Sequence, residues 1–287
     1  MEKMERRILS DVERNYLRPT KKFPSVWCAG CALGIVMGGI IRAIDSLELD
    51  NDEVALISGI GCTGRMPVYL DFNTLHTTHG RALAFATGLK MARPDLRVIT
   101  VMGDGDALAI GGNHFIHACR RNIDITAIIV NNQIYGMTGG QYSPTTPQWD
   151  LATTAPYGNL DQPFDVAELA RCAGASFVAR TSAYHTTELP KLVAQGIAKP
   201  GFAVVEVIAH CHTNYGKLNR KGGAVEMLQW QRDNVIPLAR YEKMPPEERG
   251  GKVPRGVLFE KEAPEYVAEY EKIIARAMAE AAPEEGA

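Results

Sequence analysis

Two short apolar segments near the middle of the chain constrain its fold more than any other feature. The segments Arg97–Met102 and Asp124–Val130 are continuous runs rich in Val, Ile and Thr, which is typical of strands buried on both faces of a sheet. The first run ends in Gly103-Asp104-Gly105 and the second in Asn131-Asn132. Residues 106–130 provide enough chain for a helical crossover that returns parallel to its start. We therefore expect two parallel strands whose polar loops emerge at the same edge of the sheet.

The two polar loops carry side chains suited to a hard metal ion. The carboxyl ends of parallel strands are where α/β proteins bind ligands, so Asp104 and Asn132 should converge there. A carboxylate and an amide oxygen suit Mg²⁺, which completes its octahedron with phosphate oxygens and water. The glycines allow close backbone approach, and a helix start nearby favours negative charge. The alternative is two unrelated turns, because Gly, Asp and Asn favour turns in general.

The rest of the chain alternates predicted helices and strands. This rhythm indicates an α/β fold with a mainly parallel sheet and helices on both faces. We expect helices at 33–47, 82–92, 166–173, 187–198, 225–235 and 264–281, and further strands at 53–58, 176–180 and 202–208, with a Pro/Gly-rich linker before the last helix.

The chain divides into three parts by composition. Residues 1–24 are polar and contain Pro19 and Pro24, so we interpret them as an N-terminal arm. The main domain should span 25–212, and 213–287 should be a C-terminal extension that packs on this domain or on a partner. Residues 139–163 form an irregular stretch too long for a simple connection, and such loops are usually functional or lie against a partner.

Charge and apolar patterning exclude several classes of function. The 287 residues carry a net charge of −2, which gives no reason to expect nucleic acid or an anionic membrane as a partner. No apolar run reaches the length of a bilayer span, and the first fifteen residues lack the apolar region of a secretory signal. We therefore expect a cytoplasmic protein.

Four of the six cysteines have the spacing of a metal centre. Cys28 and Cys31 form a CxxC motif, while Cys62 and Cys211 each follow a predicted strand. Four such thiolates suit either tetrahedral Zn²⁺ or an iron–sulfur cluster, and nearby glycine amides slightly favour the cluster. A thioredoxin-like CxxC is the rival interpretation, but the segment before it is short and contains proline. The other two cysteines, Cys119 and Cys172, lie among apolar residues on predicted helices, where buried structural thiols are expected.

A formal dinucleotide fingerprint, GxGxxG, spans Gly59 to Gly64. The match is weak, because Pro67 interrupts the helix that should follow. No acidic residue stands about 20 positions further on, where His79 is found instead. A nicotinamide site is therefore a minor alternative.

Taken together, the motifs resemble the β subunit of the 2-oxoacid:ferredoxin oxidoreductases. The GDG and NN loops match the thiamine diphosphate motif of that family. The resemblance runs from Trp27 to about Trp230 through WCAGCALG, SGIGCTGR, HTTHGRALAFATGLK, GDGDALAIGGNHFIHACRRN, NNQIYGMTGGQYSPTT, CHTNYGKLN and GGAVEMLQWQ. Ala29 departs from the pattern, since the family usually has proline in its CxxC.

The resemblance implies a thiamine diphosphate-binding fold of the pyrophosphate type, with Mg²⁺ and one 4Fe-4S cluster. Its implied cluster ligands are Cys28, Cys31, Cys62 and Cys211, and its implied Mg²⁺ ligands are Asp104, Asn132 and the Ile134 carbonyl. The residues implied to contact the cofactor are Ile60, Gly61, Cys62, Thr63, His79, Gly103, Asp104, Gly105, Asp106, Asn132, Gly136, Met137 and Thr138.

The resemblance also implies the reaction and the partners. The subgroup that the chain most resembles is the 2-oxoglutarate type, which converts 2-oxoglutarate and CoA to succinyl-CoA and CO₂ and passes electrons to ferredoxin. His79 would act near the cofactor, and Arg65 is a candidate for the distal carboxylate, because a guanidinium matches carboxylate geometry. The glutamate that activates the aminopyrimidine in thiamine enzymes lies on a second domain, which we do not find. We therefore expect an α subunit, in an (αβ)₂ assembly.

Several alternatives stay open at this stage. Pyruvate or branched-chain 2-oxoacids are alternative substrates, and the reaction can run towards reductive carboxylation. A non-oxidative thiamine enzyme subunit and a zinc-stabilised interaction subunit without chemistry are the rival classes. Metal analysis separates the three classes of protein.

Overall fold

The computed structural model describes residues 15–21 and 23–281. Most of the expected N-terminal arm lies outside these residues. Near the start of the described part, Leu17 is buried and forms an isolated antiparallel bridge with Leu70. No helix in the two described ranges is long and apolar enough to cross a bilayer.

The core of the molecule is an eight-stranded sheet with the order β2-β1-β3-β4-β6-β5-β8-β7. Six neighbouring strands run parallel, β8 lies antiparallel to β5, and the short β7 runs parallel to β8. The strands are β1 (Val54–Ser58), β2 (Asn73–His76), β3 (Arg97–Gly103), β4 (Thr126–Asn131), β5 (Phe177–Ser182), β6 (Ala203–Ile208), β7 (Val235–Pro237) and β8 (Val253–Glu260). The prediction of a mainly parallel α/β sheet is confirmed.

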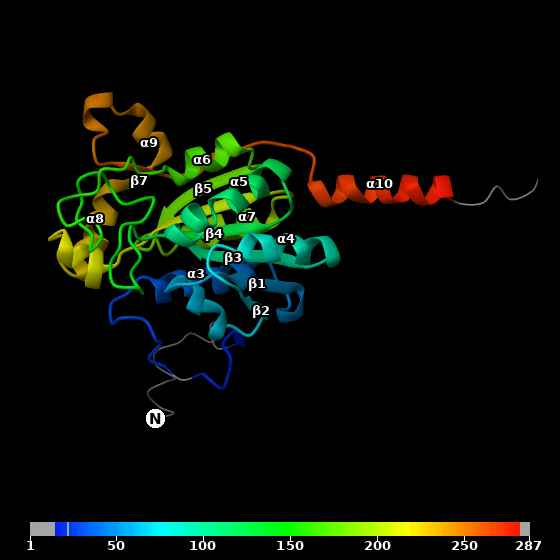
Figure 1. Cartoon of the computed structure of the whole chain (residues 1–287), viewed down its shortest axis with the longest axis horizontal. Coiled ribbons are helices and arrows are strands. Elements are labelled where there is room, and N and C mark those ends of the chain that lie inside the picture. The colour runs from blue at the N-terminus through cyan, green and yellow to red at the C-terminus, as the bar shows by residue number, and fades with distance from the viewer. Residues whose placement is uncertain (1–14, 22, 282–287) are drawn as a thin grey trace, which may run out of the picture.

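Helices cover both faces of the sheet, as expected for strands that are apolar on both sides (Figure 1). One face packs against α3 (Leu33–Ser46) and α7 (Leu189–Ala198), and the other against α4 (Ala82–Ala92), α5 (Gly112–Arg121) and α6 (Val166–Ala173). The helices α3 and α7 also contact each other at Gly39. A Cβ atom there would lie 1.9 Å from Cδ2 of Leu189, so only glycine permits this approach.

The structure corrects the prediction of a linker before the last helix. That region contains β7, α9 (Leu238–Lys243) and β8, and β8 extends the sheet beside β5. Pro254 and Gly256 lie within β8. Proline and glycine are uncommon in strands, so their presence argued against predicting a strand here. Both are tolerated in strands near the edge of a sheet. The strand β2 was also not predicted, because Asn73–His76 is short and polar.

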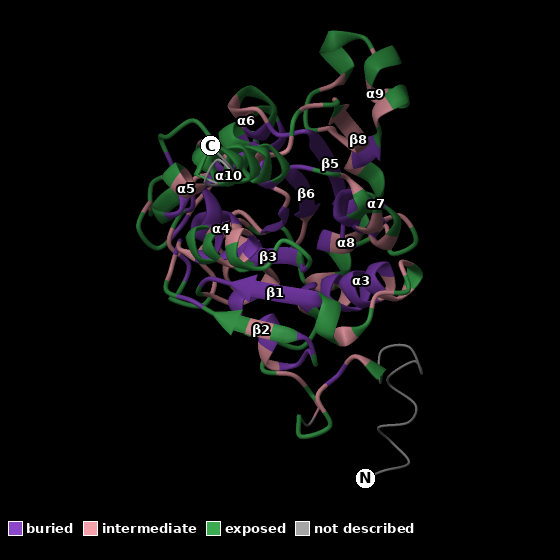
Figure 2. Cartoon of the chain, turned by 90° about the vertical axis from the view of Figure 1, so that its right-hand side faces the viewer, coloured by how far each residue is buried: buried purple, intermediate pink, exposed green. Residues whose placement is uncertain are grey.

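The last two long helices confirm the predicted helical segments but differ in their packing. The helix α8 (Ala224–Asn234) lies beside the segment that follows Cys211. The helix α10 (Tyr266–Ala281) projects from the body of the molecule, and Val267 is its one buried residue (Figures 1 and 2). The division of the chain into 1–24, 25–212 and 213–287 stays a prediction.

The central strand–helix–strand unit has the predicted geometry. The strands β3 and β4 are parallel neighbours, with Ile99 opposite Thr126 and Gly103 opposite Val130. Between them lie a π-helical turn, Asp106–Ile110, and α5. The polar loops therefore emerge side by side at one edge of the sheet.

Candidate active site

A pocket of about 110 Å³ lies at the carboxyl ends of β1, β3 and β4. Every residue expected to contact the cofactor lines it, and so does Ile134. The lining residues are Ile60, Gly61, Cys62, Thr63, His79, Gly103, Asp104, Gly105, Asp106, Asn132, Ile134, Tyr135, Gly136, Met137 and Thr138. Four segments that are separate in sequence thus form one site: 60–63, His79, 103–106 and 132–138.

Asp104 is fully buried at the end of β3. Its Oδ2 atom accepts hydrogen bonds from Ser143 Oγ at 2.5 Å and from Thr145 Oγ1 at 2.6 Å. Burial raises the pKa of this carboxyl group, and the two hydroxyls oppose the increase. A bound cation would further offset the cost of burying the negative charge. On the neighbouring loop, the Oδ1 atom of Asn132 accepts a hydrogen bond from the Ile134 amide at 3.3 Å, which keeps these two expected ligands together.

Ser143 and Thr145 were not predicted as individual site residues. They belong to 139–163, the irregular stretch that was expected to be functional. These two residues contact Asp104 only because the loop folds back over the edge of the sheet. No local pattern in the sequence indicates such a contact.

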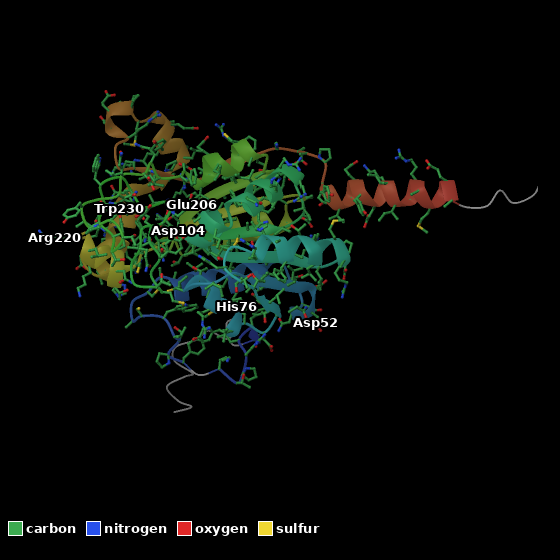
Figure 3. The ribbon with its side chains drawn as sticks, viewed as in Figure 1. Asp52, His76, Asp104, Glu206, Arg220 and Trp230 are labelled. Carbon is green, nitrogen blue, oxygen red and sulfur yellow. The ribbon has the colours of Figure 1, made fainter. Side chains whose placement is uncertain are left out.

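A buried polar chain extends from Asp104 beneath the pocket. Thr145 Oγ1 also lies 2.9 Å from Oδ1 of Asn131, and Asn131 Nδ2 donates to Glu206 Oε1 at 2.8 Å. Glu206 in turn accepts from Arg180 Nε at 2.6 Å. Figure 3 shows Asp104 and Glu206 in the same region of the molecule.

The far end of the polar chain is an ion pair on β5 and β6. Arg180 is 4% exposed and Glu206 is 1% exposed, so both charges lie in the interior. Burial alone would lower the pKa of Arg180, but Glu206 and Asp165 raise it above its ordinary value. The carboxylate of Asp165 accepts a hydrogen bond from Arg180 and also from the amides of Ala167 and Glu168 in the first turn of α6, which connects this helix to the chain of contacts. A buried pair of this kind requires both partners.

His79 is held by the carboxylate of Asp106, and both residues line the pocket. The distance between His79 Nδ1 and Asp106 Oδ1 is 2.6 Å, and the same oxygen accepts the Gly80 amide at 2.7 Å. The other oxygen of Asp106 is buried without a hydrogen-bond partner. A Cβ atom at Gly59 would lie 2.1 Å from that oxygen, so glycine is needed there. The side chain of His79 is 35% exposed and remains accessible from the pocket.

Tyr135 is the lining residue that the sequence interpretation missed. Its hydroxyl donates to the Gly105 carbonyl at 3.1 Å, and its ring lies edge-on to that of His79 at 6.0 Å between centroids. Burial raises the pKa of Tyr135 to about 12, so the phenol stays neutral at physiological pH. Tyr135 directly follows Ile134, an expected Mg²⁺ ligand, and this position in the sequence could have indicated that Tyr135 also lines the pocket.

Four cysteines converge next to the pocket. Burial raises the pKa of Cys31 to about 11, and the neighbouring thiols of Cys62, Cys211 and Cys28 contribute in the same direction. A Cβ atom at Gly136 would lie 3.2 Å from Cys211 Sγ and 3.9 Å from Cys62 Sγ, so a side chain at this position would intrude on the sulfurs.

The chemistry of the four thiols fits the cluster that the family resemblance implies. Thiolates are the usual ligands of 4Fe-4S clusters, and four of them also suit a single Zn²⁺ ion, so metal analysis must separate the two.

Hydrogen bonds join the segments that carry these cysteines. The indole Nε1 of Trp27 donates to the Cys62 carbonyl at 2.8 Å. Nε2 of His210 lies 2.8 Å from the Gly30 carbonyl, which belongs to the CxxC loop. These contacts hold the three segments together across long distances in the sequence.

Three further sequence expectations have different outcomes. Arg65 is exposed and is not among the residues that line the pocket, and its role toward the distal carboxylate stays a prediction. Cys119 is buried as expected. The prediction of a buried Cys172 was wrong, because α6 turns Val166, Ala167 and Ala170 inward and leaves Cys172 exposed.

The GxGxxG segment also has a structural explanation that needs no dinucleotide. Residues Thr63–Val68 form a short 3₁₀ helix with Pro67 inside it. A Cβ atom at Gly64 would lie 2.4 Å from the Gly59 carbonyl oxygen, and His76 Nδ1 lies 2.7 Å from the Gly64 carbonyl oxygen. The glycines therefore permit a tight loop between β1 and β2.

The chain is similar in sequence to a defined family of proteins. Residues 59–207 match the family model described as thiamine pyrophosphate enzyme, C-terminal TPP binding domain. The chain is 47% identical over 265 residues to 2-oxoglutarate synthase subunit KorB of Methanocaldococcus jannaschii, covering 92% of this chain and 98% of the relative. It is 56% identical over 200 residues to the subunit of the same name from Archaeoglobus fulgidus, covering 70% and 74%.

A solved structure has the same architecture. The 2-oxoglutarate:ferredoxin oxidoreductase from Magnetococcus marinus, with 2-oxoglutarate, coenzyme A and succinyl-CoA bound, aligns with a TM-score of 0.81. The match covers 94% of this chain and 96% of that chain, at 33% sequence identity.

Proposed function

The chain belongs to the family of 2-oxoacid:ferredoxin oxidoreductase β subunits that includes 2-oxoglutarate synthase subunit KorB. We propose that, together with an α subunit, it catalyses the oxidative decarboxylation of 2-oxoglutarate. In this reaction, 2-oxoglutarate, CoA and two molecules of oxidised ferredoxin give succinyl-CoA, CO₂, a proton and two molecules of reduced ferredoxin. Each ferredoxin accepts one electron. The observation that carries the proposal is the position of four convergent cysteines beside a thiamine-type pocket.

We assign the anionic end of thiamine diphosphate to the loops after β3 and β4. Asp104, Asn132 and the Ile134 carbonyl would hold Mg²⁺, which prefers such oxygen ligands. Backbone and side-chain groups of Gly105, Asp106, Gly136, Met137 and Thr138 would surround the diphosphate. When bound, thiamine diphosphate supplies the electron sink for decarboxylation, and the cluster supplies one-electron transfer.

His79 and Asp106 form a positioned pair at this cofactor site. A carboxylate accepts hydrogen bonds only, so His79 carries its proton on Nδ1 and leaves Nε2 as the acceptor in its neutral form. Tyr135 limits the movement of the ring on one side. The pair is therefore suited to receiving or returning a proton at His79 Nε2.

Cys28, Cys31, Cys62 and Cys211 are the proposed ligands of a 4Fe-4S cluster. Ligation requires all four as thiolates, whereas burial raises the pKa of Cys31 and Cys62 in the free chain. Loading therefore releases protons. Since Cys62 lines the cofactor pocket as well, electrons would have a short path from one cofactor to the other.

An α subunit is needed to complete the pocket. Sites for cofactors usually enclose roughly 300–1,000 Å³, whereas this pocket measures about 110 Å³. We propose that the α subunit supplies the pyrimidine side with its activating glutamate, and that the assembly is (αβ)₂. In the C-terminal extension, β7 and β8 complete the sheet while α10 projects from it, so we propose that the extension packs both on its own domain and on a partner.

We also propose a cytoplasmic location. Cluster assembly needs free thiols, and the cytoplasm keeps cysteines reduced.

A substrate panel on the co-expressed αβ complex tests the proposal. The complex should reduce ferredoxin fastest with 2-oxoglutarate and CoA, and more slowly with pyruvate or branched-chain 2-oxoacids. Faster turnover of another oxoacid would contradict the substrate assignment but keep the enzyme class. If Arg65 binds the distal carboxylate in the complex, R65Q should raise KM for 2-oxoglutarate. Ferredoxin reduction by the isolated β chain would contradict the need for an α subunit.

A further inference from the structure

Thr213 joins two of the proposed cluster ligands. It lies in a π-helical turn, His212–Gly216, that directly follows Cys211. Its Oγ1 atom is 3.8 Å from Cys28 Sγ and 3.7 Å from Cys211 Sγ. Both distances are within the range for hydrogen bonds to sulfur. Among the described residues, no other side-chain hydroxyl forms a hydrogen bond to a cysteine sulfur.

The direction of this hydrogen bond depends on whether the cysteines carry their protons. In the free chain either the hydroxyl or a thiol can be the donor. A cysteine that ligates iron is a thiolate, which has no proton and can only accept. In the hydrogen bond to Cys28 or Cys211, the hydroxyl of Thr213 is then the donor. The nearly equal distances allow donation to either sulfur.

We propose that Thr213 raises the reduction potential of the cluster by donating this hydrogen bond. The proposal rests on the function proposed above. Hydrogen bonds to the sulfurs are among the factors that set the potential of an iron–sulfur centre. A donor stabilises the reduced cluster more than the oxidised one, because reduction adds negative charge that the sulfurs share. Cluster reduction then becomes more favourable.

The surroundings of Thr213 argue for an electrostatic role. Both Thr213 and Cys28 are exposed, so the threonine side chain fills no core cavity. Cys31 and Cys62 are less exposed, and among the described residues no side-chain hydroxyl forms a hydrogen bond to either of their sulfurs. The donor thus stands at the most accessible edge of the four cysteines. At this edge, a change in one hydroxyl alters the cluster while leaving the packing of the fold intact.

The test compares T213V, which is nearly isosteric but lacks the hydroxyl, with T213S, which retains it. Each variant is made in the anaerobically purified αβ complex. The midpoint potential is measured by a redox titration that follows the EPR signal of the reduced cluster. We expect T213V to shift the potential to a lower value and T213S to keep the wild-type value. T87V on α4, where Thr87 donates to the Leu83 carbonyl, is the matched control far from the cysteines.

An unchanged potential in T213V, or an equal shift in T213S, would overturn the proposal. Iron content should match the wild type in every variant, because Thr213 is not a ligand. T213A removes the hydroxyl without adding a second methyl group, so it repeats the comparison if T213V assembles poorly. Iron loss in both T213V and T213A, but not in T213S, would show a structural role and contradict tuning. A wild-type complex without iron would instead contradict the proposed function itself.

Discussion

The hydroxyl of Thr145 donates to Asp104 at 2.6 Å, across 41 positions of sequence. Asp104 ends a central strand, whereas Thr145 lies in the long irregular loop 139–163. This contact ties the loop to the carboxylate that we assign to Mg²⁺. Ser143 binds the same carboxylate oxygen, so the loop fixes the orientation of the expected ligand from one side.

We predict that T145V weakens Mg²⁺ binding. Loss of a residue that orients a metal ligand typically costs about 10- to 100-fold in metal affinity. The measurement is the Mg²⁺ dependence of thiamine diphosphate binding by the αβ complex. T154V is a suitable control, because Thr154 lies in the same loop but accepts a bond from the Tyr142 amide. Equal effects of both substitutions would indicate general disruption of the loop.

We predict that G59A lowers activity without unfolding the chain. The new Cβ would lie 2.1 Å from Oδ2 of Asp106 and would displace the carboxylate that holds His79. Misplacement of a catalytic group by about 1 Å can cost on the order of 10²-fold in rate. The measurement is kcat of the complex with circular dichroism as a check on folding.

The control for G59A is G34A. A Cβ atom at Gly34 has no neighbour within 4 Å, so activity should not change. Replacement of a helical glycine by alanine should raise stability by roughly 0.5–1 kcal/mol. Wild-type activity in G59A would contradict the role assigned to Asp106.

We predict that R180M destabilises the fold by roughly 3–5 kcal/mol, because Glu206 would remain as an unpaired buried charge. The double variant R180M/E206M should recover most of this loss. The measurement is urea unfolding of the purified chain. R171M is the matched control, since Arg171 forms an exposed pair with Glu168 that should contribute about 1 kcal/mol or less. A double variant less stable than R180M would contradict the account.

We predict that His185 makes stability depend on pH below neutrality. Burial lowers its pKa, Arg255 acts in the same direction, and Glu188 opposes them. The unfolded chain therefore binds this proton more readily than the folded chain. As pH falls through about 6.5, the ordinary value for histidine, the free energy of unfolding should decrease. Above about pH 7.5, His185 is neutral in both states and its contribution should be constant.

The check on this prediction is urea unfolding of wild type and H185Q at a series of pH values. Glutamine cannot titrate. The decrease in the free energy of unfolding between pH 7 and the lowered pKa of His185 should therefore be smaller in H185Q than in the wild type. Equal slopes for the two proteins would assign the pH dependence to other groups.

The sequence predicted the central part of the fold because the signals there are local. The strands Arg97–Gly103 and Thr126–Asn131 are continuous apolar runs that end in turn residues, and α4 was predicted with its observed bounds. Many of the residues that line the pocket, at 103–106 and 132–138, lie at or directly after the ends of these two strands. The family resemblance supplied the positions that periodicity alone could not identify, including His79 and Gly136.

The features that sequence reasoning missed depend on contacts between distant segments. Val253–Glu260 contains proline and glycine and pairs as a strand only because β5 offers an edge. Ser143 and Thr145 reach Asp104 only after the loop has folded back. Cys172 is surrounded by apolar residues in the sequence, but its exposure is decided by which face of α6 packs against the sheet.

The most direct test of the central claim is metal analysis of the αβ complex after anaerobic purification. The claim is that one edge of the sheet holds both a magnesium–diphosphate site and a four-iron cluster. We predict about four irons per β chain together with Mg²⁺ and thiamine diphosphate, which is the composition of a 4Fe-4S enzyme. The variant C62S should lose iron and C172S should not. A colourless complex that contains zinc in place of iron would contradict the account.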